Sequence, residues 1–232
     1  MERKFKFSEG EYYHVYNRGV DKRDIFLVGD DSRRFQKLLY VANSTKGVEM
    51  RLVKSLPLEK IEIGEKITAI GAYCLMPNHF HILVKETTQG GISSFMSKLS
   101  TGYSMYFNTV NKRTGALFQG AFKAEHVDND EYLKYLYSYI HLNPAKLIDP
   151  TWKELGICDV KKTRTYLENY HYSSYLDYLG VDREEKLILS KSEFPEYFDK
   201  PKDFQEYVDD WLEFVKNGDV NRDSDHSEVS PP

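Results

Sequence analysis

Two histidines, His79 and His81, lie one residue apart in the stretch PNHFHILV, directly after a turn-forming Pro-Asn pair. The residues that follow are apolar, as in a strand, where alternate side chains project to the same face of a sheet. Both imidazoles would then point to one face while Phe80 and Ile82 enter the other, so both can reach one divalent cation. Two ligands are too few for a closed site, and the pair therefore predicts a metal site that takes a third ligand from elsewhere in the chain. A structural or merely exposed histidine pair is the alternative.

The third ligand is predicted on the segment YLKYLYSYIHLNP, residues 132–144, which reads as a helix. Tyr139 and Asn143 are four residues apart and so are neighbours on one helical face, with Tyr135 one turn earlier. Asn143 would complete the metal shell or fix its geometry. Because Pro144 disfavours helical backbone at the residue before it, a capping role for Asn143 is the alternative.

A phenol and an amide oxygen beside two imidazoles and a cation form a set suited to phosphoryl transfer. The cation polarises a phosphoryl oxygen and offsets negative charge in the transition state. The phenol of Tyr139, with a reference pKa of about 10, becomes a usable nucleophile when it is held in line with the phosphorus and near positive charge. A tyrosine-rich helix that belongs only to the core is the alternative.

The charge distribution favours a nucleic-acid partner although the net charge is −4. Residues 1–150 carry 21 Lys and Arg against 17 Asp and Glu, whereas residues 151–232 carry 11 against 19. The segment 87–124 has no acidic residue, and basic and aromatic side chains run through it: Lys98, Lys112, Arg113, Lys123, Tyr103, Tyr106, Phe107, Phe118 and Phe122. Such a segment suits a single strand, because cations neutralise phosphates and aromatic faces stack on splayed bases. An amphipathic helix with core aromatics is the alternative.

The remaining composition indicates a soluble cytoplasmic protein with no membrane partner. Cys74 and Cys158 lie far apart without metal-type spacing, which favours a reducing compartment over a disulfide scaffold. The first residues carry charge but no apolar core of a secretory signal. No apolar run approaches the roughly 18 residues needed to span a bilayer.

The elements that must position these residues follow from hydrophobic periodicity and turn signals. The expected order is strand Glu11–Asn17, a helix from Asp30 or Asp31 to Ala42, short strands near 51–54 and 60–63, strand Ile67–Leu75, strand His79–Val84, a helix from Gly90-Gly91 to Val110, strand Leu117–Val127, and a helix capped by Asp128 or Asp130 and ended by Asn143-Pro144. This β-α-β-β-α-β order followed by a helix predicts an α+β fold of the split βαβ, ferredoxin-like type. Two helices would cover one face of an antiparallel sheet, and the other face would hold a ligand or the added tyrosine-bearing helix.

The length of 232 residues suits one main domain with an extension. We expect the main domain over residues 1–150 and a helical extension over 151–215, packed on or near the core. The extension would pack through Trp152–Leu179 and carry an acidic amphipathic helix over Phe194–Val215. Residues 216–232 are polar and acidic, which predicts a disordered tail.

Five stretches in order resemble a known family, and a sixth follows them. They are YYHVYNRG at 12–19, YCLMPNHFHILV at 73–84, YSMYFN at 103–108, GALFQGAFK at 115–123 and YLYSYIHLNPAK at 135–146, with HYSSYLDYLG at 171–180. Together they make the chain similar to the IS200-like, single-tyrosine HUH transposases, and most similar to the REP-associated tyrosine transposases. The acidic end of the chain and the stretch around 54–65 are not explained by this resemblance.

The resemblance implies an activity and a set of site residues. His79 and His81 correspond to the metal ligands, Tyr139 to the nucleophile, and Asn143 is similar to the third polar ligand. The implied substrate is single-stranded or hairpin DNA, cleaved with Mg²⁺ or Mn²⁺ to give a 5′-phosphotyrosine and a 3′-hydroxyl. The implied enzyme is an HUH endonuclease, and the resemblance leaves open whether it is a monomer or a homodimer with an exchanged tyrosine helix.

DNA contacts are predicted from the same motifs and from the segment without acidic residues. The side chains expected to bind DNA are His14, Arg18, Lys112, Arg113, Lys123 and Tyr103. His14 is expected near the DNA and outside the metal shell, with a structural role as the alternative. Two other functions stay open from the sequence, a non-catalytic protein that binds nucleic-acid hairpins and a replication or plasmid-transfer initiator with the same chemistry.

Overall fold

A four-stranded antiparallel sheet forms the centre of the molecule. The computed structural model describes residues 6–152 and 156–216. The strands are β1 (Tyr12–Arg18), β2 (Ala69–Met76), β3 (His79–Lys85) and β4 (Lys123–Val127). They are ordered β2-β3-β1-β4, and every neighbouring pair is antiparallel. This order is the one that a split βαβ unit produces, so the predicted α+β, ferredoxin-like fold is confirmed.

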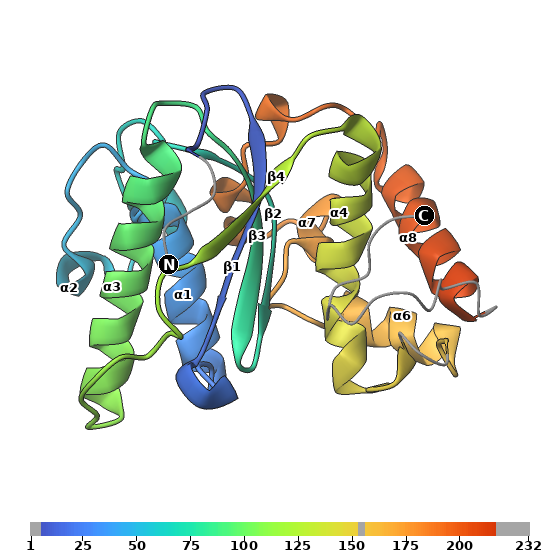
Figure 1. Cartoon of the computed structure of the whole chain (residues 1–232), viewed down its shortest axis with the longest axis horizontal. Helices are drawn as coiled ribbons and strands as arrows, with labels where there is room; N and C mark the ends of the chain where they lie inside the picture. The colour runs from blue at the N-terminus through green and yellow to red at the C-terminus, as the bar shows by residue number, and fades with distance from the viewer. Residues whose placement is uncertain (1–5, 153–155, 217–232) are drawn as a thin grey trace.

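Helices cover both faces of the sheet (Figure 1). Helices α1 (Gly29–Val41) and α3 (Gly91–Val110) pack on one face, and α4 (Asp130–Leu142) packs on the other. Each face has its own hydrophobic core. The second face is thus occupied by the predicted tyrosine-bearing helix.

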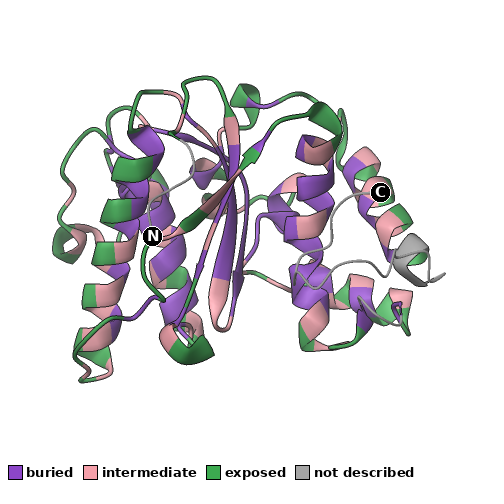
Figure 2. Cartoon of the chain, in the orientation of Figure 1, coloured by how far each residue is buried: buried purple, intermediate pink, exposed green. Residues whose placement is uncertain are grey.

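Strand β3 shows how alternation divides side chains between these two cores. Phe80 and Ile82 lie in the core beneath α1 and α3, whereas Leu83 lies in the core beneath α4. His81 alternates with Phe80 and Ile82, and therefore projects toward α4. Figure 2 shows that the middle of the sheet and the inward sides of the helices are buried.

Two helix starts depend on particular residues. Gly90 has φ +81° as the N-cap of α3, and a Cβ on Gly91 would lie 2.0 Å from the Ile67 carbonyl oxygen, so this Gly-Gly pair allows the helix to begin against β2. At α4 the cap is Asn129, one residue from both predicted caps, and its side chain accepts a hydrogen bond from the Tyr132 amide at 2.7 Å.

Three predicted strands differ from the structure. The expected strand near 51–54 is instead a short helix, α2 (Met50–Val53). The expected strand near 60–63 is irregular chain that follows the 3-10 turn η2 (Leu58–Lys60), with Leu58 buried in the core. The expected strand at 117–127 begins only at Lys123. A single bridge joins Phe118 to Gly19, and Gly120, with φ +84°, then turns the chain before the strand starts.

The extension forms a third small core beside α4. Its elements are α6 (Val160–Glu168), α7 (Tyr175–Tyr178), η4 (Glu184–Ile188), η5 (Lys191–Glu193) and α8 (Pro201–Lys216). Helix α8 starts seven residues later than predicted, at a proline suited to the first turn of a helix. Two further 3-10 turns are η1 (Val20–Lys22) and η3 (Asn143–Leu147). The predicted tail lies outside the described residues from position 217 onward.

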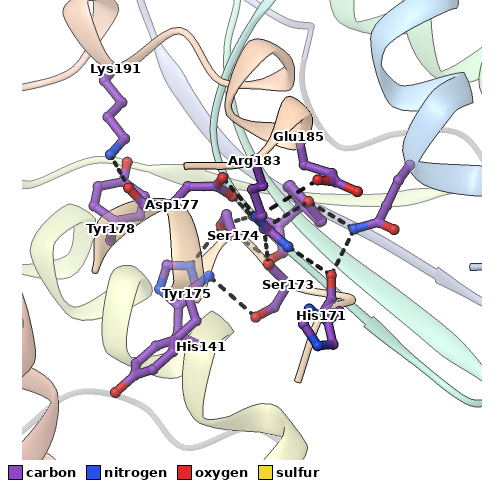
Figure 3. A network of polar contacts seen from close by, with 12 residues as sticks. His141, His171, Ser173, Ser174, Tyr175, Asp177, Tyr178, Arg183, Glu185 and Lys191 are labelled. Atoms are coloured by element: carbon purple, nitrogen blue, oxygen red, sulfur yellow. Dashed lines mark hydrogen bonds and ion pairs between the residues drawn. The ribbon is translucent and has the colours of Figure 1, made fainter. Parts of the chain in front are cut away.

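A buried polar network joins the extension to the outer edge of the sheet (Figure 3). Ser174 donates its amide to the Tyr73 carbonyl and accepts from the Tyr73 amide at its hydroxyl, both at 2.9 Å. The His141 Nε2 atom of α4 lies 2.7 Å from the same hydroxyl. Arg183 and Asp177 form an ion pair at 2.5 Å beside it, with 11% and 0% of their side chains exposed. These contacts protect the edge of β2 and hold the C-terminal end of α4.

Within the described ranges, no helix combines the length and the apolar character that crossing a membrane requires.

Candidate active site

The ring of Tyr139 lies against His81, one of the two predicted metal-binding histidines, within one chain. The Tyr139 and His81 ring centroids are 5.6 Å apart with the planes 86° to one another, and His79 and His81 are 5.0 Å apart. His81 is 5% exposed, whereas Tyr139 and His79 are half-buried at the edge of this group. The helix and the strand that the sequence singled out therefore meet at these side chains.

The packing of α4 sets which tyrosine faces the histidines. Leu136 and Ile140 pack on the sheet, which fixes the rotation of the helix. Tyr137 is 2% exposed in the same core, and burial raises the pKa of its phenol. Tyr135 is 5% exposed and packs on Trp211 of α8 with ring centroids 5.0 Å apart. Tyr139 is the tyrosine of these three with described ring contacts to the site histidines.

His14 belongs to this group, which the sequence did not predict. It is 1% exposed on β1, one of the two central strands, and its Nε2 atom lies 2.9 Å from Nδ1 of His81. Its ring centroid is 5.7 Å from that of Tyr139. The prediction of a DNA contact at His14 is corrected, because α4 covers this face of β1 and the side chain reaches His81 instead.

The hydrogen bonds of His79 and His81 suit metal ligation through Nε2. Asn78 donates its Nδ2 to the Lys22 carbonyl at 3.2 Å, which turns its Oδ1 toward His79, 2.5 Å from Nδ1. An amide oxygen only accepts, so Nδ1 of His79 carries the proton and Nε2 carries the lone pair. His81 likewise uses Nδ1 in its contact with His14. Two imidazole nitrogens together with oxygen ligands are compatible with Mn²⁺ or Mg²⁺.

The third ligand stays a prediction. Among the described residues, no group of three or more His, Cys, Asp and Glu could hold a metal ion, so an oxygen from another source must complete a site at the two histidines. Asn143 is 3% exposed, and its Nδ2 donates to the Tyr139 carbonyl at 2.8 Å. Asn143 is the C-cap of α4 with helical backbone, at φ −51° and ψ −41°, and Pro144 lies in the first turn of the 3-10 turn η3.

The predicted DNA contact at Tyr103 is wrong. Tyr103 of α3 is fully buried against Phe35 of α1, and its hydroxyl donates to the Ile25 carbonyl. Phe107 and Phe118 are also buried, at 2% and 7% exposure. The aromatic residues of this segment thus belong largely to the core, because Tyr103, Phe107 and Phe118 are buried in the same cluster as Phe95.

The predicted basic contacts lie at or near the surface. Arg18 is exposed and pairs with Gln119, and Lys123 is exposed with its Nζ 5.8 Å from the Tyr16 ring centroid. Lys112 is exposed, and the half-buried Arg113 donates to Asn108 Oδ1 at 2.7 Å. These positions are compatible with phosphate contacts.

Sequence reasoning missed three polar residues around the histidines, namely Glu125, Tyr16 and Asn78. Tyr16 donates its hydroxyl to Glu125 Oε1 at 2.8 Å, and Glu125 Oε2 lies 3.8 Å from Nδ1 of His14. The alternation of His14 and Tyr16 along one strand was a signal that both face the same side. The pairing of Glu125 with His14 across β1 and β4 had no local signal.

Comparison with known proteins agrees with the sequence motifs. Residues 58–143 match the family model described as "Transposase IS200 like", which covers β2, β3, α3, β4 and α4 and ends at Asn143. This match agrees with the resemblance to IS200-like transposases that the sequence motifs carry.

The comparison with solved structures also gives a match. It is described as "Structure of the REP associates tyrosine transposase bound to a REP hairpin", and it shares 14% identity over 80% of this chain and 90% of that chain, with a TM-score of 0.47. The comparison with curated proteins finds no match.

Proposed function

We propose that the protein is a metal-dependent DNA transposase that cleaves and transfers single strands at hairpin-associated sites through a phosphotyrosine on Tyr139. The observation that carries this proposal is the contact of the Tyr139 ring with His81, at 5.6 Å between centroids, in one chain. The family match over residues 58–143 supports the same reaction class.

The side chains divide the chemistry between binding and attack. His79 and His81 would hold the cation through Nε2, and Asn143 is the proposed source of an additional oxygen. When bound, Mg²⁺ or Mn²⁺ supplies a positive charge that polarises the scissile phosphate and stabilises its transition state. The packing of α4 against the sheet holds the Tyr139 ring beside the same point, so the nucleophile need not be recruited by a large movement.

The covalent step is a direct exchange of oxygen atoms on phosphorus. The Tyr139 phenol loses its proton, its oxygen bonds to phosphorus, and the bond from phosphorus to the 3′-oxygen breaks. The 3′-oxygen takes up a proton and leaves as a hydroxyl, while the 5′-phosphate stays on Tyr139. The energy of the phosphodiester is retained, so a 3′-hydroxyl can reverse the step and join a new strand without a nucleotide cofactor.

Binding of DNA is proposed at the basic side chains around this site. Arg18 ends β1 and Lys123 begins β4, so both lie at the same end of the sheet. Lys112 and Arg113 follow α3 and precede that strand. These cations would bind phosphates and position the strand without reading its sequence.

A covalent-adduct assay tests the proposal. Incubation with hairpin-bearing single-stranded DNA and Mn²⁺ should give a protein–DNA adduct that survives denaturation, and Tyr139→Phe should abolish it. Tyr135→Phe and Tyr137→Phe are the matched controls, and both should retain the adduct.

The same assay separates the competing functions. Chelation by EDTA should prevent the adduct. Salt-sensitive hairpin binding that EDTA leaves intact, with no adduct from any substrate, would instead identify a non-catalytic hairpin-binding protein. An adduct that persists in Tyr139→Phe and disappears in Tyr135→Phe or Tyr137→Phe would move the nucleophile to another residue.

A further inference from the structure

We propose that Glu125 and His14 form a positioning chain that holds His81 in the tautomer required for metal binding. The chain runs across three neighbouring strands, from Glu125 on β4 through His14 on β1 to His81 on β3. The inference rests on the proposed metal site at His79 and His81. Neither His14 nor Glu125 is itself a proposed metal ligand.

The carboxylate of Glu125 is held from two sides. Tyr16 of β1 donates to its Oε1 at 2.8 Å, and Tyr132 of α4 donates to its Oε2 at 3.4 Å. The same Oε2 lies 3.8 Å from Nδ1 of His14. His14 is directly opposite Glu125 in the pairing of β1 with β4, so the strand register maintains this approach.

The carboxylate of Glu125, at one end of the positioning chain, determines which ring nitrogen carries the proton in His14 and in His81. A carboxylate accepts only, so Glu125 favours the proton of neutral His14 on Nδ1 and leaves the lone pair on Nε2. That lone pair accepts from Nδ1–H of His81 across the 2.9 Å contact. His81 then carries its own lone pair on Nε2, which is the atom assigned to the metal. The opposite arrangement would place a proton on Nε2 of His81 and prevent ligation.

His79 reaches the same tautomer by another route. Its Nδ1 faces the Asn78 amide oxygen at 2.5 Å, and that amide is oriented by the Lys22 carbonyl. The two histidines thus have separate acceptors at Nδ1, one from the adjacent turn and one from a buried imidazole. Hydrogen-bond partners of metal-bound histidines fix ring orientation and raise ligand basicity, and their loss weakens metal binding by about 10- to 100-fold.

Metal affinity provides the first test. Calorimetric titration of the full chain with MnCl₂, without DNA, should show about 10- to 100-fold weaker binding for His14→Phe than for the unmodified protein. His14→Gln should retain most of the affinity, because its Oε1 can accept from His81 and its Nε2 can donate to Glu125. Glu125→Leu should also weaken Mn²⁺ binding, although less than His14→Phe does, because Glu125 acts on His81 through His14.

Matched controls come from the neighbouring surface. His126 lies on β4 beside Glu125 and is exposed, with Nε2 2.7 Å from Glu11 Oε2. The variants His126→Phe and Glu11→Gln should both leave Mn²⁺ affinity unchanged. Equal affinities for the unmodified protein, His14→Phe and Glu125→Leu would overturn the inference.

A spectroscopic test does not depend on metal binding. Long-range ¹H–¹⁵N correlation spectra of the metal-free protein should show His81 as the Nδ1–H tautomer, and Glu125→Leu should shift it toward Nε2–H. Detection of Nε2–H at His81 in the unmodified protein would overturn the proposal. If His81→Ala leaves Mn²⁺ affinity unchanged, the proposed metal site itself fails, which this spectrum distinguishes from a failure of the positioning chain.

Discussion

Tyr139 and His81 meet edge to face in a single chain, with ring centroids 5.6 Å apart, although they come from a helix and a strand on different parts of the sequence. The contact follows from α4 packing on the face of the sheet that the histidines share. One chain therefore contains both parts of the proposed site.

This arrangement predicts that cleavage occurs in cis. A mixture of Tyr139→Phe with His81→Ala should form no covalent DNA adduct, because each chain lacks one half of its own site. The unmodified protein diluted with either variant serves as the positive control. Restoration of the adduct in the mixture would show that a partner copy supplies the tyrosine helix.

Basic residues at the proposed DNA surface should affect binding uniformly across sequences. Lys123→Ala should weaken binding of hairpin DNA and reduce the slope of log affinity against log salt by about 1, as expected for loss of one phosphate contact. Fluorescence anisotropy at several salt concentrations measures both effects. Lys146→Ala is the matched control, because Lys146 lies beyond the C-terminal end of α4. An equal effect of Lys146→Ala would show that the DNA-binding surface lies elsewhere.

The buried Tyr103 should behave as a stability residue. Tyr103→Phe removes the donor to the Ile25 carbonyl, and an unsatisfied buried acceptor costs about 1–3 kcal/mol in the free energy of unfolding. Denaturant unfolding should detect this loss while hairpin affinity under native conditions stays unchanged. A loss of affinity in a fully folded Tyr103→Phe protein would restore Tyr103 as a DNA contact.

The Arg183–Asp177 ion pair should be important for stability because it is buried. Arg183→Met leaves the Asp177 carboxylate without its partner, at 0% side-chain exposure, and should lower the free energy of unfolding by about 3–5 kcal/mol. The exposed pair Lys186–Asp182 is the matched comparison, and Lys186→Met should change stability little. Similar losses at the two pairs would contradict the role of burial.

Acid should destabilise the fold partly through His141. Burial lowers the pKa of His141 to about 3 from 6.5, so the unfolded chain binds the proton more readily than the folded one. Its contribution to stability is present above pH 6.5 and is lost as the pH falls toward 3, at up to about 1.4 kcal/mol per pH unit. The difference in this slope between the unmodified protein and His141→Gln measures the effect. His126→Gln is the exposed control, and an unchanged slope in His141→Gln would exclude this cause.

Local patterns predicted the framework of the site. Strand alternation placed His79 and His81 on one face, since a period of two depends only on neighbouring residues. Helical spacing likewise placed Tyr139 and Asn143 on one face of the helix. The order of strands and helices predicted the sheet, because few connections satisfy a split βαβ sequence of elements.

Predictions were wrong where one local pattern suits two different structures. Aromatic residues at helical spacing suit either a stacking surface or a core, and Tyr103 became core because α1 covers its side of α3. The residues at 60–63 suit a short strand, but this stretch is irregular and follows the 3-10 turn η2, which buries Leu58. In both cases the deciding contact comes from a distant part of the chain.

The sequence by itself determined the two imidazoles, the phenol four residues before an asparagine, and the elements that carry them. Only the tertiary structure decided that Tyr139 faces His81 while Tyr137 is buried, and that His14 and Glu125 lie behind His81. Alternation and helical period act between near neighbours in the chain. The rotation of α4 and the register of three strands depend on packing between segments far apart, which no local spacing encodes.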